Sequence, residues 1–203
     1  MLHFINFERR EVHGTLDIFK QQKILSVEHD YNNACYIITT KKAIHLIDDF
    51  TLGPKVKFEG KYKKCQIRQD GLILLLGQDN SIIKRKIGDP DFKEVIRITE
   101  GTPEKIQFSS NGLYFGALIK NPYHLKIWLI DQNEHLFTFN ENNKFEHFVI
   151  DGDSEEINSY AVCFDEEYAK LWDCDLGCFI NSFDFSRYGS FREFKALDWC
   201  SSS

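Results

Sequence analysis

Cysteine and histidine are the residues of this sequence that could bind a metal ion or act as a nucleophile. Cys174 and Cys178 are separated by three residues, a spacing found in structural zinc sites. Such a site takes four ligands, usually as two closely spaced pairs, and no second pair lies near this one. Asp175 and Gly177, between the two cysteines, are typical of a hairpin turn. We therefore predict that these cysteines flank a turn, and that the chain binds no metal and no cofactor.

The sequence shows no recognisable set of catalytic residues. A nucleophilic cysteine requires a nearby base in an electropositive setting, and no motif places one of the seven histidines beside a cysteine. Carboxylates gather at residues 48–49, 151–156 and 165–167, but 151–156 lacks the ligand spacing of a calcium loop. The sequence also contains no glycine-rich phosphate loop. These patterns predict a protein that is not an enzyme.

The composition is that of a folded, β-rich protein. Hydrophobic residues make up 42% of the chain and aromatic residues 14%, which is enough apolar material for a core. The formal net charge is −6, whereas a free-standing nucleic-acid-binding domain usually has a basic face, so we do not expect nucleic acid as a partner. Two short basic clusters, residues 61–64 and 84–86, are interpreted as solvated rims.

Apolar runs in the sequence are short. Residues 72–76 form an uninterrupted apolar run that suits a buried strand, because a membrane span needs roughly 18 apolar residues. Residues 1–10 lack the basic-then-apolar order and the small-residue cleavage site of a signal peptide. The six cysteines are then expected to be reduced thiols. We expect a cytoplasmic protein without a membrane partner.

A repeat of nearly constant length organises the chain. Four segments each begin with an alternating apolar strand, pass a polar turn and continue into a second apolar strand. Val27, Ile67, Phe108 and Ile150 are equivalent positions, separated by 40, 41 and 42 residues. That spacing matches the roughly 40–45 residues of a four-stranded β-propeller blade. The sequence therefore predicts an all-β fold, a β-propeller with four four-stranded blades.

The strands of each predicted blade follow from alternation and from the turn residues between them. The expected first strands are 24–27, 64–67, 105–108 and 147–150, and the expected second strands are 34–39, 72–76, 113–119 and 157–162. The expected third strands are 43–47, 81–86, 124–130 and 168–172, and the expected fourth strands are 55–58, 94–98, 136–139 and 178–183. No stretch longer than about ten residues has the apolar spacing of a helix.

This spacing also sets the predicted domain organisation. The four blades are expected at 22–60, 61–101, 102–143 and 144–185. Residues 1–21 form an N-terminal segment that could supply an outer strand, with a turn at His13-Gly14. Residues 186–203 read as the start of a fifth blade, so the ring is not closed. We expect the front part of a longer seven-bladed or double propeller; the alternative is a small arc that a partner closes.

Residues 168–183 resemble the WD-repeat family of β-propellers. They contain a third strand that ends in the Trp172-Asp173 dipeptide, then a Gly turn and a fourth strand, in the order of that family. Residues 124–131 resemble the same strand with the acidic residue displaced. The dipeptide occurs once and no blade has the preceding Gly-His, so most blades cannot form the family's buried His–Asp–Ser/Thr–Trp network. The resemblance implies a scaffold for protein–protein interactions, with blades stabilised by apolar packing and ladder hydrogen bonds.

A narrower resemblance is to the family of WD-repeat protein eight. Residues 88–101 are similar to a blade exit of that family, and 107–114 and 124–128 fit its next blade in order and spacing, as 194–203 fit a later turn. Trp is missing from the first strand of blades two and three, and the fourth blade lacks that family's charged insert. The resemblance implies an adaptor at centrosomes, spindle poles or ciliary bases, with coiled-coil proteins of a larger assembly as partners.

Three aromatic residues in predicted loops, Phe92, Tyr123 and Tyr188, are the expected contacts to protein partners. Two other functions are compatible with a propeller fold and would leave different patterns of charge in the sequence. An RNA- or ribosome-associated propeller module, acting in translation or ribosome biogenesis, would have both basic clusters on one face. A propeller enzyme would need several carboxylates that converge at the central channel, whereas the acidic clusters here fall in turns at varied blade positions.

Overall fold

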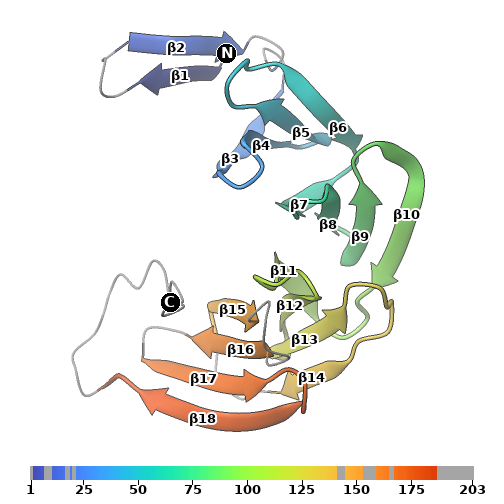
Figure 1. Cartoon of the computed structure of the whole chain (residues 1–203), viewed down its shortest axis with the longest axis vertical. Coiled ribbons are helices and arrows are strands. Elements are labelled where there is room, and N and C mark those ends of the chain that lie inside the picture. Colours follow the sequence, from blue (N-terminus) through green and yellow to red (C-terminus); the bar gives the residue numbers. More distant parts are fainter. Residues whose placement is uncertain are drawn as a thin grey trace. The chain divides into compact units, whose positions relative to one another are not determined.

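The computed structural model describes residues 2–6, 11–16, 19, 22–140, 145–152, 159–164 and 167–186 of the 203-residue chain. These residues form 18 β-strands and no α-helix (Figure 1). In this part of the chain, no helix is long and apolar enough to cross a membrane. The chain divides into two compact units, residues 1–94 and 95–203, and each is described by itself.

The first unit contains a two-stranded hairpin and two four-stranded antiparallel sheets. Its strands are β1 (Leu2–Asn6), β2 (Glu11–Leu16), β3 (Ile24–Asp30), β4 (Cys35–Thr40), β5 (Ala43–Asp48), β6 (Pro54–Glu59), β7 (Tyr62–Ile67), β8 (Leu72–Gly77), β9 (Ser81–Lys86) and β10 (Asp89–Arg97). The sheet orders are β3-β4-β5-β6 and β7-β8-β9-β10, so consecutive strands pair throughout. β10 runs across the boundary between the units.

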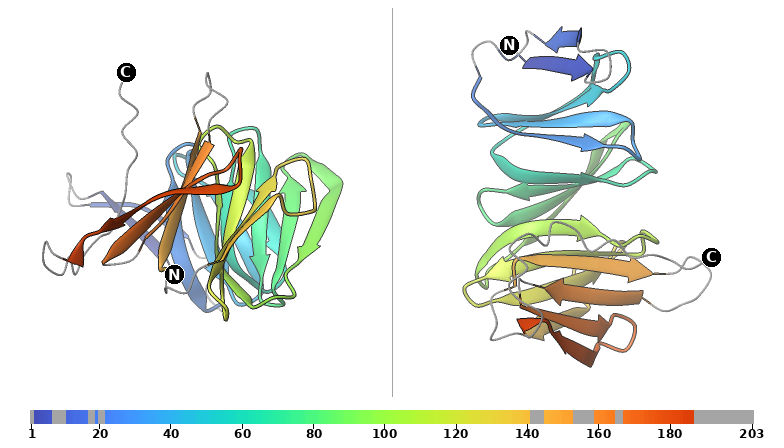
Figure 2. Two further views of the ribbon diagram at one scale, coloured as in Figure 1. Left: turned by 90° about the horizontal axis from the view of Figure 1, so that it is seen from below. Right: turned by 90° about the vertical axis from the view of Figure 1, so that its left-hand side faces the viewer.

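The second unit contains two further four-stranded antiparallel sheets. Its strands are β11 (Thr102–Phe108), β12 (Tyr114–Lys120), β13 (His124–Leu129), β14 (Phe137–Asn140), β15 (His147–Gly152), β16 (Ser159–Phe164), β17 (Tyr168–Asp173) and β18 (Cys178–Asp184). The orders are β11-β12-β13-β14 and β15-β16-β17-β18. Figure 2 shows from two further sides that these sheets are twisted, as antiparallel sheets of L-residues must be.

An apolar core lies between the two four-stranded sheets of the first unit. All six residues of β8, from Leu72 to Gly77, are buried, so the second sheet is covered on both faces along this strand. Ile73 and Leu75 are both fully buried and belong to the shared cluster. The first sheet contributes Cys35, Ile37, Ile44 and Leu46 to this core, and the second contributes Tyr62, Cys65, Ile73 and Leu75. Burying each large aliphatic side chain stabilises the fold by about 1.5–3 kcal/mol.

The β1–β2 hairpin packs on the first four-stranded sheet through a separate core. Leu16 and Phe19 join Ile38 and Ile47 in a buried cluster, on the face opposite to Ile37, because successive residues of a strand point to opposite faces. The predicted turn at His13-Gly14 is wrong, since both residues lie inside β2. A Cβ atom at this glycine would collide with the Leu52 side chain, so the glycine permits close packing rather than a turn.

The core of the second unit is rich in aromatic residues. Trp172 is only 4% exposed, and its ring stacks on Phe139 with 5.2 Å between ring centroids. Asp173, the other half of the Trp-Asp dipeptide, fixes the following turn: its Oδ1 accepts the backbone N–H groups of Asp175 and Leu176, each at 2.8 Å. The dipeptide therefore anchors β17 in the core and shapes the turn into β18.

The outer strand of the second sheet begins earlier than the sequence indicates. β10 starts at Asp89 rather than near residue 94, so Phe92 lies in a strand and not in a loop. The Asp89 carboxylate accepts the backbone N–H groups of Asp91 and Phe92, at 3.2 and 3.1 Å. Arg85 Nη1 donates to the Pro90 carbonyl at 2.9 Å, and proline is tolerated because the outer edge of this strand needs no donor.

Candidate functional site

The cysteines of the described residues are mostly buried. Cys35, Cys65, Cys163 and Cys174 are buried thiols outside any disulfide, whereas the Cys178 thiol is exposed. Burial raises the pKa of Cys174 to about 12, which disfavours the thiolate that a nucleophile or a metal ligand requires. The described residues contain no group of three or more His, Cys, Asp or Glu that could hold a metal ion.

The basic cluster 84–86 is partly internal. Lys84 is 1% exposed, and its Nζ forms an ion pair with Glu94 Oε2 on the neighbouring strand β10. The interpretation of this cluster as a solvated rim is therefore wrong for Lys84. In the other cluster, Lys64 Nζ lies 2.6 Å from Glu28 Oε1, which joins the two four-stranded sheets of the first unit. Both clusters thus supply cations to contacts within the fold.

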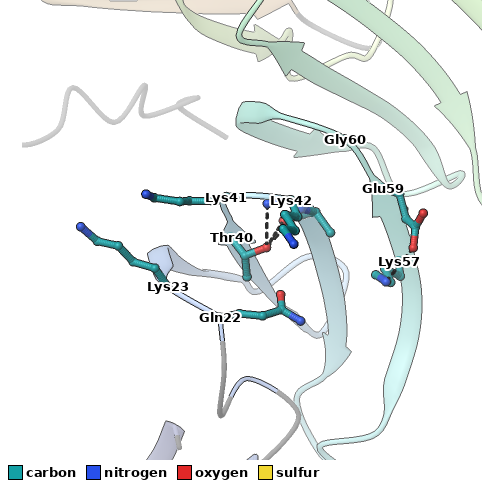
Figure 3. A pocket seen from close by; sticks show the side chains of 9 residues that line it. Gln22, Lys23, Thr40, Lys41, Lys42, Lys57, Glu59 and Gly60 are labelled. Atoms are coloured by element: carbon teal, nitrogen blue, oxygen red, sulfur yellow. Dashed lines mark hydrogen bonds and ion pairs between the residues drawn. The ribbon is translucent and has the colours of Figure 1, made fainter.

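A pocket of about 740 Å³ lies at one end of the sheet β3–β6 (Figure 3). The segment before β3, the turn between β4 and β5, and the end of β6 supply its walls. The lining residues are Gln22, Lys23, Thr40, Lys41, Lys42, Ala43, Lys57, Glu59 and Gly60. Four of these nine residues carry a positive charge and one carries a negative charge, in a chain whose formal net charge is −6.

The register of the sheet brings these distant residues together. Ile24 pairs with Thr40, so Lys23 and Lys41 extend the same strand pair by one residue at the pocket end. On the other side, Ala43 pairs with Glu59, and the Gly60 N–H donates to the Lys42 carbonyl at 2.8 Å. Three segments of one sheet therefore place their lysines around a common space.

Thr40 holds the turn that presents Lys41 and Lys42. Its side chain is buried, and its Oγ1 donates to the Ala43 carbonyl at 3.0 Å. The same oxygen accepts the backbone N–H groups of Lys42 at 3.3 Å and of Ala43 at 3.1 Å. The backbone of the turn is thereby fixed, and only the two lysine side chains are left to adapt to a bound group.

The positive charges of the pocket are poorly compensated from within. Lys57 Nζ lies 2.8 Å from Glu59 Oε1, and this hydrogen bond lowers the pKa of the glutamate. Among the residues that the structure describes, no carboxylate forms an ion pair with Lys23, Lys41 or Lys42. Figure 3 shows Lys23 and Lys41 extending to the same side, with Glu59 at the opposite side of the pocket. The arrangement suits a negatively charged ligand.

The sequence did not reveal this pocket because its lysines form no run. They stand at positions 23, 41, 42 and 57, and each falls just before, between or within predicted strands of the repeat 22–60. The usable signal was the placement of lysines at or near the same end of the strands β3 to β6. That signal requires the strand register, since a shift by one residue would turn every side chain to the other face.

The three aromatic contacts expected from the sequence are not brought together. Phe92 lies partly buried in β10 and Tyr123 lies partly buried in the turn between β12 and β13, while Tyr188 falls outside the described residues. The sequence did not indicate the two most exposed aromatic residues of the described part of the chain, Tyr31 at 85% and Phe50 at 86%. They lie in the β3–β4 and β5–β6 turns, at the end of the first sheet opposite to the lysine pocket.

Comparison with known proteins defines the fold. No family model and no curated protein matches the chain. The structure is similar to a chain in the crystal structure of a mitotic checkpoint complex, with a TM-score of 0.69 at 12% sequence identity. The match covers 89% of this chain and 57% of that chain, so this chain spans little more than half of its neighbour's length. With its meanders of four consecutive strands, the chain is an all-β protein with the fold of a partial β-propeller.

Proposed function

We propose that this chain is a non-catalytic WD-repeat scaffold that binds other proteins within a larger assembly. The lysine-lined pocket of the first sheet is the observation that carries this proposal. Its Lys23, Lys41 and Lys42 side chains are exposed, and no carboxylate of the described residues pairs with them. Charges arranged in this way attract a partner and orient it, because complementary potentials steer association.

The pocket is better suited to binding than to chemistry. Thr40 supplies its one hydroxyl group, which already forms three hydrogen bonds to the turn backbone. Among the described residues that line the pocket, no cysteine or histidine supplies the usual pairing of a nucleophile with a base. A fixed turn backbone that carries exposed lysine side chains is suited to docking another protein.

The finer form of the proposal concerns the assembly. We place it in the cytoplasm, at the centrosome, spindle pole or ciliary base, because residues 88–101 and 124–128 resemble the family of WD-repeat protein eight. Phe92, Tyr123 and Tyr188 are proposed as further partner contacts. The buried Lys84 weighs against the RNA-associated alternative, since that alternative needs both basic clusters on one solvent-facing surface.

Amine-reactive cross-linking in cells followed by mass spectrometry tests this proposal. We expect cross-links from Lys23, Lys41 or Lys42 to lysines of other proteins. The Lys41→Glu/Lys42→Glu variant should lose those partners, whereas Lys93→Glu, an exposed lysine on β10 outside the pocket, should keep them. Recovery of the same partners at the same yield with both variants would contradict a role for the pocket, and recovery of no stable partner would contradict the scaffold.

A further inference from the structure

We infer that the lysine pocket of the first sheet binds an acidic segment of its protein partner, a run of Asp and Glu side chains. This inference rests on the proposed scaffold function and names the chemistry of the partner. The pocket is lined by four ammonium groups and one carboxylate, and that carboxylate is already paired with Lys57. No carboxylate of the described residues pairs with the remaining cations, Lys23, Lys41 and Lys42, so they can bind an anionic ligand.

The geometry favours a row of carboxylates over a single anion. Lys23 precedes β3, Lys41 and Lys42 form the β4–β5 turn, and Lys57 lies in β6, so the charges are spread along the end of one sheet. Lysine is a compact point charge on a flexible stem, so each ammonium group can follow a separate carboxylate. None of the described residues that line the pocket is an arginine, although bidentate recognition of a single phosphate usually employs one.

The lining also distinguishes a peptide from a nucleic acid. Proteins that bind single-stranded nucleic acid combine a basic groove with aromatic side chains on which bases stack. None of the nine lining residues is aromatic, and two of them, Gln22 and Thr40, are neutral and polar. An acidic peptide needs no stacking surface. Its carboxylates require only the cations, and its amides can hydrogen-bond to water or to Gln22.

The fixed turn limits the cost of binding. Thr40 Oγ1 and the Gly60 N–H hold the backbone of residues 41–43 from two sides. Binding therefore orders lysine side chains but no backbone, which restricts the entropy that is lost. Exposed charge pairs contribute little individually, about twofold to fivefold in affinity for each lysine, so the pocket acts through several pairs at once.

Fluorescence anisotropy with a labelled oligoglutamate peptide tests the inference. We expect the chain to bind this peptide more tightly than an oligoglutamine peptide of equal length, and the affinity should fall as salt is added. Lys41→Glu/Lys42→Glu should weaken binding by about tenfold or more, since attraction becomes repulsion. Lys41→Arg/Lys42→Arg should retain binding, and Lys93→Glu should match the unchanged chain, with circular dichroism confirming that every variant folds.

Each other outcome has a defined meaning. Equal binding of oligoglutamate to the unchanged chain and to the Lys41→Glu/Lys42→Glu variant would overturn the inference. Tighter, Lys41/Lys42-dependent binding of a labelled oligouridine would overturn it in favour of RNA. If oligoglutamate does not bind but the pocket lysines still cross-link to partner proteins, the inference of an acidic partner segment is wrong and the proposed scaffold function is retained. If neither oligoglutamate binding nor cross-links to partner proteins are found, the proposed scaffold function is contradicted as well.

Discussion

Tyr114→Phe should destabilise the second unit by breaking a bond between its two sheets. Tyr114 lies in β12 and is 7% exposed, and its hydroxyl donates to Asp175 Oδ1 in the β17–β18 turn at 2.6 Å. Asp175 Oδ2 accepts the Ser159 N–H at 2.7 Å, so this carboxylate joins three segments. Burial and the neighbouring carboxylate both raise the pKa of Tyr114, as expected for a phenol that remains protonated beside a negative charge.

The size of the effect follows from the type of bond. A hydrogen bond to a charged group contributes about 1.5–3 kcal/mol to stability. Asp175 is only partly buried and still accepts the hydrogen bond from Ser159, so water can solvate Oδ1 once the tyrosine hydroxyl is removed. The lower end of this energy range therefore applies. We therefore expect Tyr114→Phe to lower the free energy of unfolding by about 1.5 kcal/mol, which moves the urea midpoint down by roughly 0.5–1 M.

Tryptophan fluorescence is a suitable assay because Trp128 and Trp172 are buried in the second unit. Tyr160→Phe is the matched control, since the described residues offer no hydrogen bond to its hydroxyl, and its midpoint should not change. Tyr114→Phe and Asp175→Asn should also be less than additive when combined, because both remove the same bond. A midpoint for Tyr114→Phe equal to that of the control, or full additivity with Asp175→Asn, would refute the reasoning.

Three further predictions concern pH, packing and thiol reactivity. Burial lowers the pKa of His45 and of His124 below the ordinary 6.5, so the unfolded chain binds more protons than the folded chain below that pH. Stability should therefore be greatest above about pH 6.5 and fall as the pH drops through the folded-state pKa. His45→Gln should flatten this dependence of the urea midpoint on pH. Gly116→Val should destabilise the second unit by about 1–3 kcal/mol in urea titration, because a Cβ there would lie 2.7 Å from the nearest core side chain; unchanged stability would contradict the packing described. Cys178 should react with iodoacetamide at least about tenfold faster than Cys174 when the native protein is mapped by mass spectrometry, and equal rates would show that the burial of Cys174 is wrong.

Much of the strand pattern could be predicted from alternation and turn residues. The sequence predicts a strand at 81–86, and β9 has those bounds, because turn-forming residues lie directly before and after it. Asn80 adopts a φ of 62° and Gly88 a φ of 85°, in the left-handed region that asparagine and glycine tolerate. The turns at Gly71 and Gly112, with φ of 84° and 70°, are explained in the same way.

The early start of β10 could not be predicted from local preference. Asp89 and Pro90 are poor strand formers, and their presence predicts a loop. Pairing with β9 overrides that preference, because Arg85 donates to the Pro90 carbonyl and β10 is the terminal strand of its sheet, where proline is tolerated. The burial of Lys84 has a similar origin: only the partner strand, through Glu94, makes a buried ammonium group tolerable.

The candidate site was not predictable without tertiary structure. The sequence showed basic runs at 61–64 and 84–86, but part of this charge is used within the fold, as the ion pair of Lys64 with Glu28 illustrates. The pocket depends instead on lysines far apart in the sequence that the sheet register brings together, namely Lys23, Lys41, Lys42 and Lys57. A lysine run in the sequence is therefore a weaker guide here than lysines placed at or near the same end of neighbouring strands.

The pairing of consecutive strands into separate sheets underlies both the fold and the pocket, and cross-strand nuclear Overhauser effects measure it most directly. In the first unit, backbone contacts are expected between Ile24 and Thr40, between Ala43 and Glu59, and between Leu74 and Lys84. No such contacts should join β6 to a strand of another sheet. Backbone contacts of β6 with any strand other than β5, or a helical pattern anywhere in residues 22–140, would contradict the propeller-type fold and the pocket that depends on it.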